Sequence, residues 1–131
     1  MKLQLTESSI FISLKRLREN LYQSLFNMDK ANRIIYGTPL MKYCGEALAK
    51  FVLAFEQSNE AKKMSYLEES FACFVVLRTD LEFCEKMNII HFKTRDGHST
   101  EKIELFKIVA KIDNDMCKWR ASLAKGKTIV A

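Results

Sequence analysis

Apolar residues recur at spacings of three and four in four stretches of this 131-residue chain. The stretch from Thr100 to Lys127 shows the pattern most clearly. Its apolar stripe consists of Leu105, Val109, Ile112, Met116, Trp119 and Leu123. This spacing places the whole stripe on one face of a helix, in near-coiled-coil register. We therefore predict a long amphipathic helix whose apolar face, Trp119 included, packs into a core.

The same periodicity predicts two helices in the first half of the chain. One runs from about Ser9 to Met28, is capped by Ser8 or Ser9, and carries the stripe Ile10, Leu14, Leu17, Leu21, Leu25 and Met28. After a turn that ends at Gly37, the next helix begins with Thr38 as N-cap and Pro39 in the first helical position. Its stripe consists of Met41, Cys44, Leu48, Phe51 and Phe55. Gly45 within this helix suggests close approach of another helix.

A third helix is predicted to begin near Asn59 or Glu60 and to end near Met87 or Asn88. Its stripe is Met64, Leu67, Phe71, Phe74, Leu77, Leu81 and Cys84. A loop follows, with a turn expected at residues 95–98. Ser99 or Thr100 then caps the last helix.

Four amphipathic helices joined by short loops predict an all-α fold, an up-down-up-down antiparallel four-helix bundle. Residues 1–131 are expected to form a single domain, because no repeat or linker divides them. Further apolar residues flank the stripes: Phe11, Phe26, Val52, Val75, Val76, Phe106 and Ile108. This surplus suggests oligomerisation, although wide apolar faces also occur in single domains.

The chain lacks the sequence features of enzymes and metalloproteins. A di-iron or di-manganese bundle needs Glu-x-x-His motifs, but the only histidines are His91 and His98, and neither completes one. Four-helix ribonucleases carry an arginine four to six residues before a histidine, whereas Arg95 lies too close to His98. No glycine-rich phosphate loop is present. We therefore expect a non-enzymatic protein with no catalytic residues, no metal and no cofactor.

The spacing of the cysteines and the hydropathy of the chain indicate the cellular compartment of the protein. Cys44, Cys73, Cys84 and Cys117 form no Cys-x-x-Cys pair, so we expect buried, reduced thiols that act as small apolar residues. No segment approaches the roughly 18 uninterrupted apolar residues of a membrane span. The N-terminus also lacks the pattern of a signal peptide. We expect a cytoplasmic protein with no membrane association.

Positive charge is concentrated near the C-terminus. The net charge is +5, yet residues 107–127 alone carry six basic residues against two acids. Cations also cluster on the first helix, which is expected to lie beside the last one. The candidate nucleic-acid-binding residues in these two regions are Lys15, Arg16, Arg18, Lys107, Lys111, Lys118, Arg120, Lys125 and Lys127. They can form a patch that binds phosphates without reading bases. The charges alone favour the alternative, a solvated face that maintains solubility.

Three segments resemble the four-helix-bundle family of rRNA intervening-sequence proteins and of Avd, the accessory variability determinant of diversity-generating retroelements. They are Tyr36-Gly37 before a long helix, the Leu-Arg-x-x-Leu pattern of residues 77–81, and residues 112–119, which end in Trp119. The resemblance follows helix order and length over nearly the whole chain. The chain departs from the family at Glu82, where a second arginine is usual, and at Asp113, Cys117 and Lys118, which replace small residues.

The resemblance implies a homo-oligomer, specifically a barrel-like homopentamer with a basic surface. It also implies a reverse transcriptase as partner, and binding to RNA or DNA. Arg78 is carried over as a further candidate contact with nucleic acid, or it pairs with Glu82 four residues later. Within the same family, the alternative is an intervening-sequence-type bundle that binds only proteins. The basic face would then pair with the acidic segment from Glu56 to Lys86 of a neighbouring subunit.

Overall fold

A computed structural model of the chain describes residues 4–90 and 100–124, and all the regular secondary structure within them is helical. The long helices are α1 (Ser9–Leu25), α3 (Thr38–Glu56), α4 (Glu60–Lys86) and α5 (Thr100–Ala124). The short elements are η1 (Leu5–Glu7), α2 (Lys30–Asn32) and η2 (Arg33–Gly37). The all-α class and the four long helices are thus confirmed for the described part of the chain. The turn predicted at residues 95–98 lies outside it.

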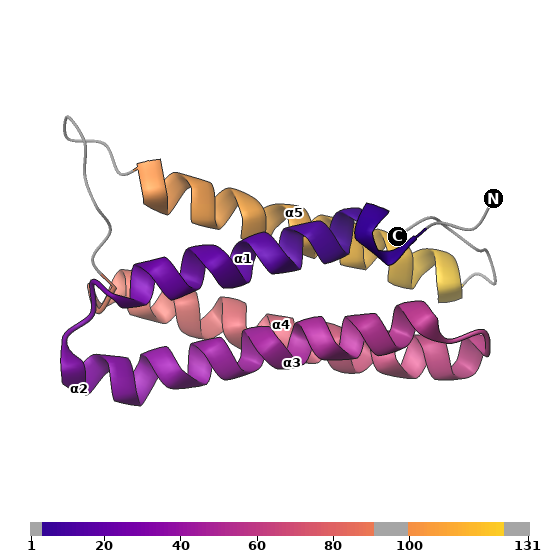
Figure 1. Cartoon of the computed structure of the whole chain (residues 1–131), viewed down its shortest axis with the longest axis horizontal. Coiled ribbons are helices and arrows are strands. Elements are labelled where there is room, and N and C mark those ends of the chain that lie inside the picture. The colour runs from indigo at the N-terminus through magenta and orange to yellow at the C-terminus, as the bar shows by residue number, and fades with distance from the viewer. Residues whose placement is uncertain (1–3, 91–99, 125–131) are drawn as a thin grey trace.

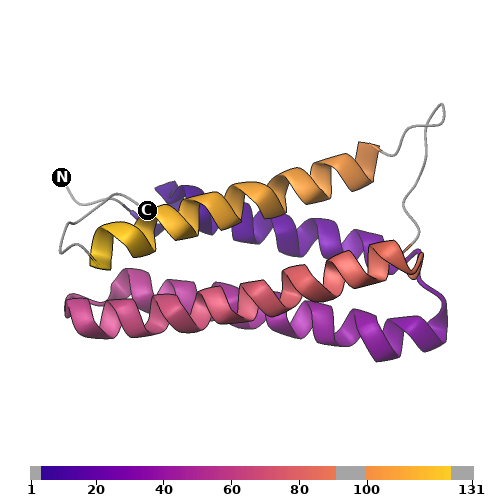
Figure 2. The ribbon, with the colours of Figure 1, turned by 180° about the vertical axis from the view of Figure 1, so that it is seen from behind.

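The long helices pack side by side in two layers. Helices α1 and α5 form one layer, and α3 and α4 form the other (Figures 1 and 2). α1 contacts both α3 and α5, so the predicted adjacency of the first and last helices is confirmed. The contact between α3 and α4 is the most extensive, whereas α4 and α5 approach each other closely at fewer positions.

The apolar stripes form the core between the layers. All members of the α1 stripe are buried, as are those of the α5 stripe except the half-buried Leu123. Trp119 is 3% exposed and packs edge-on against Phe51, with ring centroids 5.3 Å apart. Its predicted role in packing is therefore confirmed. Ile108, expected as surplus apolar surface, is instead buried in the core.

The buried face of α3 is rotated relative to the prediction. Leu40, Ala47 and Ala54 are fully buried, whereas Met41 and Leu48 are only half-buried. The predicted stripe contained larger apolar residues of this helix and omitted its alanines. Small side chains in the core let α3 and α4 approach closely, which accounts for their extensive contact.

The turn predicted between the first two helices is shorter than expected, because only residues 26–29 are non-helical and the chain from Lys30 to Gly37 is helical. α2 and η2 run directly into α3, and Gly37 has helical dihedrals (φ −66°, ψ −47°). The backbone N–H of Thr38 donates to the carbonyl of Arg33, so Thr38 is not an N-cap. Pro39 has no N–H to donate within the helix, and the wider π turn of η2 accommodates that missing bond.

Helix α1 ends at Leu25 rather than Met28 because a side chain from the next segment closes it. The Arg33 guanidinium donates to the carbonyls of Leu25 (3.3 Å), Phe26 (3.4 Å) and Met28 (3.1 Å). The carbonyls of Phe26 and Met28 lie beyond the end of α1, and that of Leu25 also accepts from the N–H of Met28 at 3.1 Å. Basic side chains commonly satisfy carbonyls at such helix ends. At the other end of α1, the Ser8 hydroxyl accepts from the N–H of Phe11, which confirms Ser8 as the cap.

The close helix approach predicted at Gly45 occurs at Gly37 instead. A Cβ on Gly45 would meet nothing within 4 Å. A Cβ on Gly37 would lie 3.3 Å from Leu25 Cδ2 and 3.4 Å from Met28 Sδ. The absence of a side chain at Gly37 therefore allows the start of α3 to pack on the end of α1.

Both ends of α4 agree with the prediction. The Asn59 side chain accepts from the N–H of Lys62 at 3.0 Å, as an N-cap does. The helix ends at Lys86, and Asn88 adopts a left-handed backbone with φ 57°. The N–H of Ile89 then donates to the carbonyl of Cys84 at 2.8 Å, and that of Asn88 to Glu85 at 3.1 Å. These two bonds form a Schellman motif.

Candidate nucleic-acid interface

The outer row of α5, defined as Lys107, Lys111 and Lys118, lies on the exposed face of the helix. Lys107 and Lys118 form no ion pair with any described residue. Lys111 Nζ lies 3.6 Å from Asp115 Oδ2, four residues along the same helix, and its side chain is 58% exposed. Lys125 and Lys127 of the predicted group lie outside the described residues.

Arg16, Arg78 and Arg120 are held in ion pairs between helices. Arg16 Nη2 of α1 lies 2.8 Å from Glu104 Oε1 of α5. Arg120 of α5 binds both carboxylate oxygens of Glu68 on α4, at 2.6 and 2.8 Å, and stacks 4.3 Å from the centre of the Phe71 ring. The hydrogen bond with Glu68 raises the pKa of Arg120. Because these guanidinium groups already bridge neighbouring helices, they are less available to a ligand.

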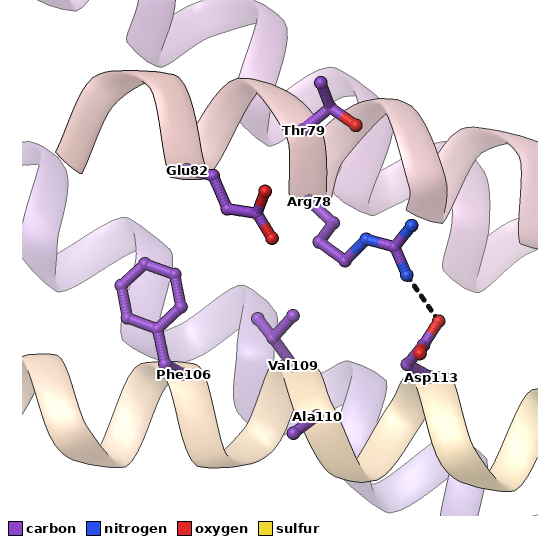
Figure 3. A pocket seen from close by; sticks show the side chains of 7 residues that line it. All are labelled: Arg78, Thr79, Glu82, Phe106, Val109, Ala110 and Asp113. Carbon is purple, nitrogen blue, oxygen red and sulfur yellow. Dashed lines mark hydrogen bonds and ion pairs between the residues drawn. The ribbon is translucent and has the colours of Figure 1, made fainter. Parts of the chain in front are cut away.

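Arg78 pairs across the seam between α4 and α5. Its Nη1 lies 2.5 Å from Asp113 Oδ1 (Figure 3). The alternative prediction, a contact with Glu82 at i+4, is therefore wrong, because Arg78 extends across to α5. Two further contacts join the same helices, between Lys102 and Glu85 and between Arg120 and Glu68.

The cations of α1 do not gather beside the outer row of α5. Successive residues turn by about 100° around a helix, so Arg16 and Arg18 project from different sides of α1. Arg16 reaches Glu104 of α5, whereas the charge of Arg18 acts on Cys44 of α3. Lys15 lies over the Phe11 ring, with Nζ 5.4 Å from its centroid. The spacing of Arg16 and Arg18 already places them on different sides of α1. Which of the two faces α5 depends on how the helices pack, and the sequence alone does not show that.

A groove of about 450 Å³ opens between α4 and α5, beside the ion pair of Arg78 and Asp113. From α4, Arg78 and Glu82 extend toward α5, and Phe106 and Val109 extend from α5 toward α4 (Figure 3). The groove is lined by Arg78, Thr79, Glu82, Phe106, Val109, Ala110 and Asp113. Sequence reasoning missed it, although Glu82 and Asp113 had been marked as departures from the family pattern.

The cysteines differ in their surroundings, contrary to the expectation that all four are buried. Cys44 and Cys84 are buried, Cys73 is half-buried and Cys117 is exposed. Burial raises the pKa of the Cys44 thiol to about 12 and that of Cys84 to about 11. Burial also raises the pKa of Cys73, whose Sγ lies 3.8 Å from Glu46 Oε2. These thiols are weak nucleophiles at neutral pH.

Neither a metal site nor a membrane-spanning helix is found among the described residues. No group of three or more His, Cys, Asp and Glu side chains is arranged there to hold a metal ion. No helix in residues 4–90 and 100–124 has the length and apolar character needed to span a membrane.

Comparison with models of known protein families, with curated proteins and with solved structures found no match to this chain. The marked residues of the resemblance nevertheless have definite places in the fold. Tyr36 packs near Phe83, with ring centroids 5.9 Å apart, and Trp119 packs against Phe51. Arg78 pairs with Asp113.

Proposed function

We propose that this chain is a non-enzymatic, homo-oligomeric accessory protein that binds RNA or DNA through the outer row of α5. The proposal rests on one observation, a contrast between the arginines that are paired within the chain and the lysines of the outer row. Arg16, Arg78 and Arg120 are held in ion pairs between helices, whereas Lys107 and Lys118 extend from one exposed helix face and have no acidic partner in residues 4–90 and 100–124. Free ammonium groups along one face are suited to phosphate oxygens.

The scaffold in this proposal is an up-down-up-down antiparallel four-helix bundle. Each long helix packs against two others, in the ring α1, α3, α4, α5 and back to α1. The ion pairs support antiparallel packing of α4 and α5, because partner numbers on α5 fall as those on α4 rise. Glu68, Arg78 and Glu85 pair with Arg120, Asp113 and Lys102 in that order.

Binding in this account is electrostatic and does not read sequence. Lys107 and Lys118 lie eleven residues apart, which is about 16 Å along a helix and spans several phosphates of a strand. Ion pairs on both flanks of α5 fix the position of the row. A lysine row offers charge without the planar fork that reads guanine edges, so affinity should depend on salt more than on base sequence.

The partner in this proposal is a reverse transcriptase, and the protein works in the cytoplasm as part of a diversity-generating retroelement. The family resemblance supplies the identity of the partner. Exposed apolar side chains support protein contacts in general: Tyr22, Phe26, Ile34, Ile35 and Met87 are each 57–62% exposed. Co-expression with a reverse transcriptase of a diversity-generating retroelement, followed by co-purification at low and high salt, tests the association.

A second function, a protein-interaction module that does not bind nucleic acid, is favoured by a separate observation. Four of the eight described candidate cations already have acidic partners within the chain: Arg16, Arg78, Lys111 and Arg120. This pairing reduces the charge available to a polyanion. In that case subunit assembly remains while affinity for RNA and DNA is negligible.

Charge reversal of the outer row separates the two functions. The variant Lys107→Glu, Lys111→Glu, Lys118→Glu should abolish binding of a fluorescent single-stranded RNA or DNA at low salt. A matched control reverses Lys30, Lys42 and Lys62, which are exposed on other elements and carry the same charge. Equal loss in both variants would indicate a net-charge effect, and unchanged binding in the outer-row variant would exclude this surface.

A further inference from the structure

Within the described part of the chain, the groove between α4 and α5 carries one carboxylate without an ion-pair partner. Arg78 and Asp113 neutralise each other across the seam. Glu82 lines the same groove and has no ion-pair partner among the described residues. Phe106, Val109 and Ala110 provide an apolar lining beside it. Such a groove suits a side chain with an apolar stem and a cationic end, which buries its methylene groups and keeps its charge near a carboxylate.

The chain itself carries a surface that complements this groove. Ile103 of α5 is 53% exposed, and Lys107 is exposed without a described acidic partner. They lie four residues apart and therefore share one face of α5. Together they offer an apolar side chain next to a free ammonium group. The groove offers an apolar lining next to a free carboxylate.

We propose that the groove binds the Ile103 and Lys107 face of α5 from a second copy of this chain. Lys107 Nζ then pairs with Glu82 of the other copy, and Ile103 covers the apolar lining near Val109 and Ala110. The Phe106 ring adds a favourable surface for the ammonium group. This inference rests on the homo-oligomeric part of the proposed function, and it assigns the contact surface. Where this contact forms, Lys107 is engaged in it, and Lys111 and Lys118 of the outer row remain for phosphate.

Charge exchange between Glu82 and Lys107 tests the inference in the full chain. We expect Glu82→Lys and Lys107→Glu each to raise the dissociation constant of self-association at least roughly tenfold at low salt. The double variant Glu82→Lys, Lys107→Glu restores the opposite charges and should return it to within roughly threefold of wild type. Sedimentation velocity over a concentration series measures all of these values. Glu19→Lys and Lys42→Glu, exposed and outside both proposed contact surfaces, are matched controls that should leave association unchanged.

Three results would overturn the inference: a monomeric wild type, wild-type association of Glu82→Lys, or no recovery in the double variant. Far-UV circular dichroism establishes that each variant is folded, and Glu82→Gln provides a milder change should Glu82→Lys unfold. The nucleic-acid proposal fails in a different measurement. If Lys118→Glu binds RNA and DNA like wild type, that proposal is weakened while the groove contact is unaffected.

Discussion

Arg78 of α4 and Asp113 of α5 form an ion pair, with 2.5 Å between Nη1 and Oδ1 and side chains 30% and 38% exposed. Asp113 is one of the positions at which this chain departs from the family pattern. Asp113 is the ion-pair partner of Arg78, which is the arginine carried over from the same pattern. The pair stands in the middle of the seam, between the contacts of Lys102 with Glu85 and of Arg120 with Glu68. Arg78 therefore has a structural role in this chain.

We predict that this pair contributes about 0.5–1 kcal/mol to the free energy of unfolding, the upper range for a partly exposed pair. Arg78→Ala, Asp113→Ala and the double variant form a thermodynamic cycle that isolates the interaction. Urea denaturation followed by circular dichroism measures each value. Strictly additive effects of the single substitutions would show that the residues do not interact.

Gly45 and Gly37 should respond in opposite ways to alanine. Gly45→Ala adds a Cβ with nothing within 4 Å, and alanine in a helix interior is favoured by about 0.5–1 kcal/mol. We expect a higher thermal midpoint for this variant. Gly37→Ala places its Cβ 3.3 Å from Leu25 Cδ2, so that packing strain offsets the gain. Equal stabilisation by both substitutions would contradict the close packing at Gly37.

Most of the fold could be predicted because helical periodicity is a local property. The stripes of α1 and α5 and the caps Ser8 and Asn59 agree with the structure. The errors arose where a distant residue decided the outcome. Pro39 does lie in the first turn of α3, as predicted, but the π turn of η2 precedes it, so the helical backbone extends back beyond the expected start. The end of α1 depends on the side chain of Arg33, which no pattern within α1 reveals.

Arg33→Ala should lower the free energy of unfolding by about 1–2 kcal/mol, because it removes donors to three carbonyls at the end of α1. Lys30→Ala, at an exposed position three residues earlier, is the matched control and should have little effect. Hydrogen exchange should also accelerate in the last turn of α1 in Arg33→Ala alone. Similar stabilities of the two variants would contradict the capping role of Arg33.

The buried thiol of Cys44 should make stability fall at alkaline pH. Burial raises its pKa from 9.0 to about 12, so the folded chain retains a proton that the unfolded chain loses. This contribution to stability is fully present below pH 9.0 and is lost as pH rises toward about 12. Between about pH 8 and 10, wild type should lose about 1 kcal/mol more than Cys44→Ala. Parallel pH profiles of the two proteins would show that Cys44 ionises normally.

The candidate site was less predictable than the fold, because pairing of charges depends on neighbours distant in sequence. The lysines of the outer row could be assigned from spacing alone, since they lie opposite the core of their own helix. Arg16, Arg78 and Arg120 could not, because their partners lie on other helices. The groove beside Glu82 likewise exists only once α4 and α5 are brought together.

The salt dependence of nucleic-acid affinity tests the central proposal most directly. Each phosphate contact contributes a slope of about −0.7 in log Kobs against log salt for a single strand. Wild type should therefore show a slope between about −1.4 and −2, given contacts from Lys111 and Lys118 and a further contact from Lys107 where it does not engage Glu82. The variant with all three reversed should show no measurable binding, while the control reversed at Lys30, Lys42 and Lys62 should retain the wild-type slope. A wild-type affinity that does not change with salt, or a slope unaltered by reversal of the outer row, would contradict the proposed function.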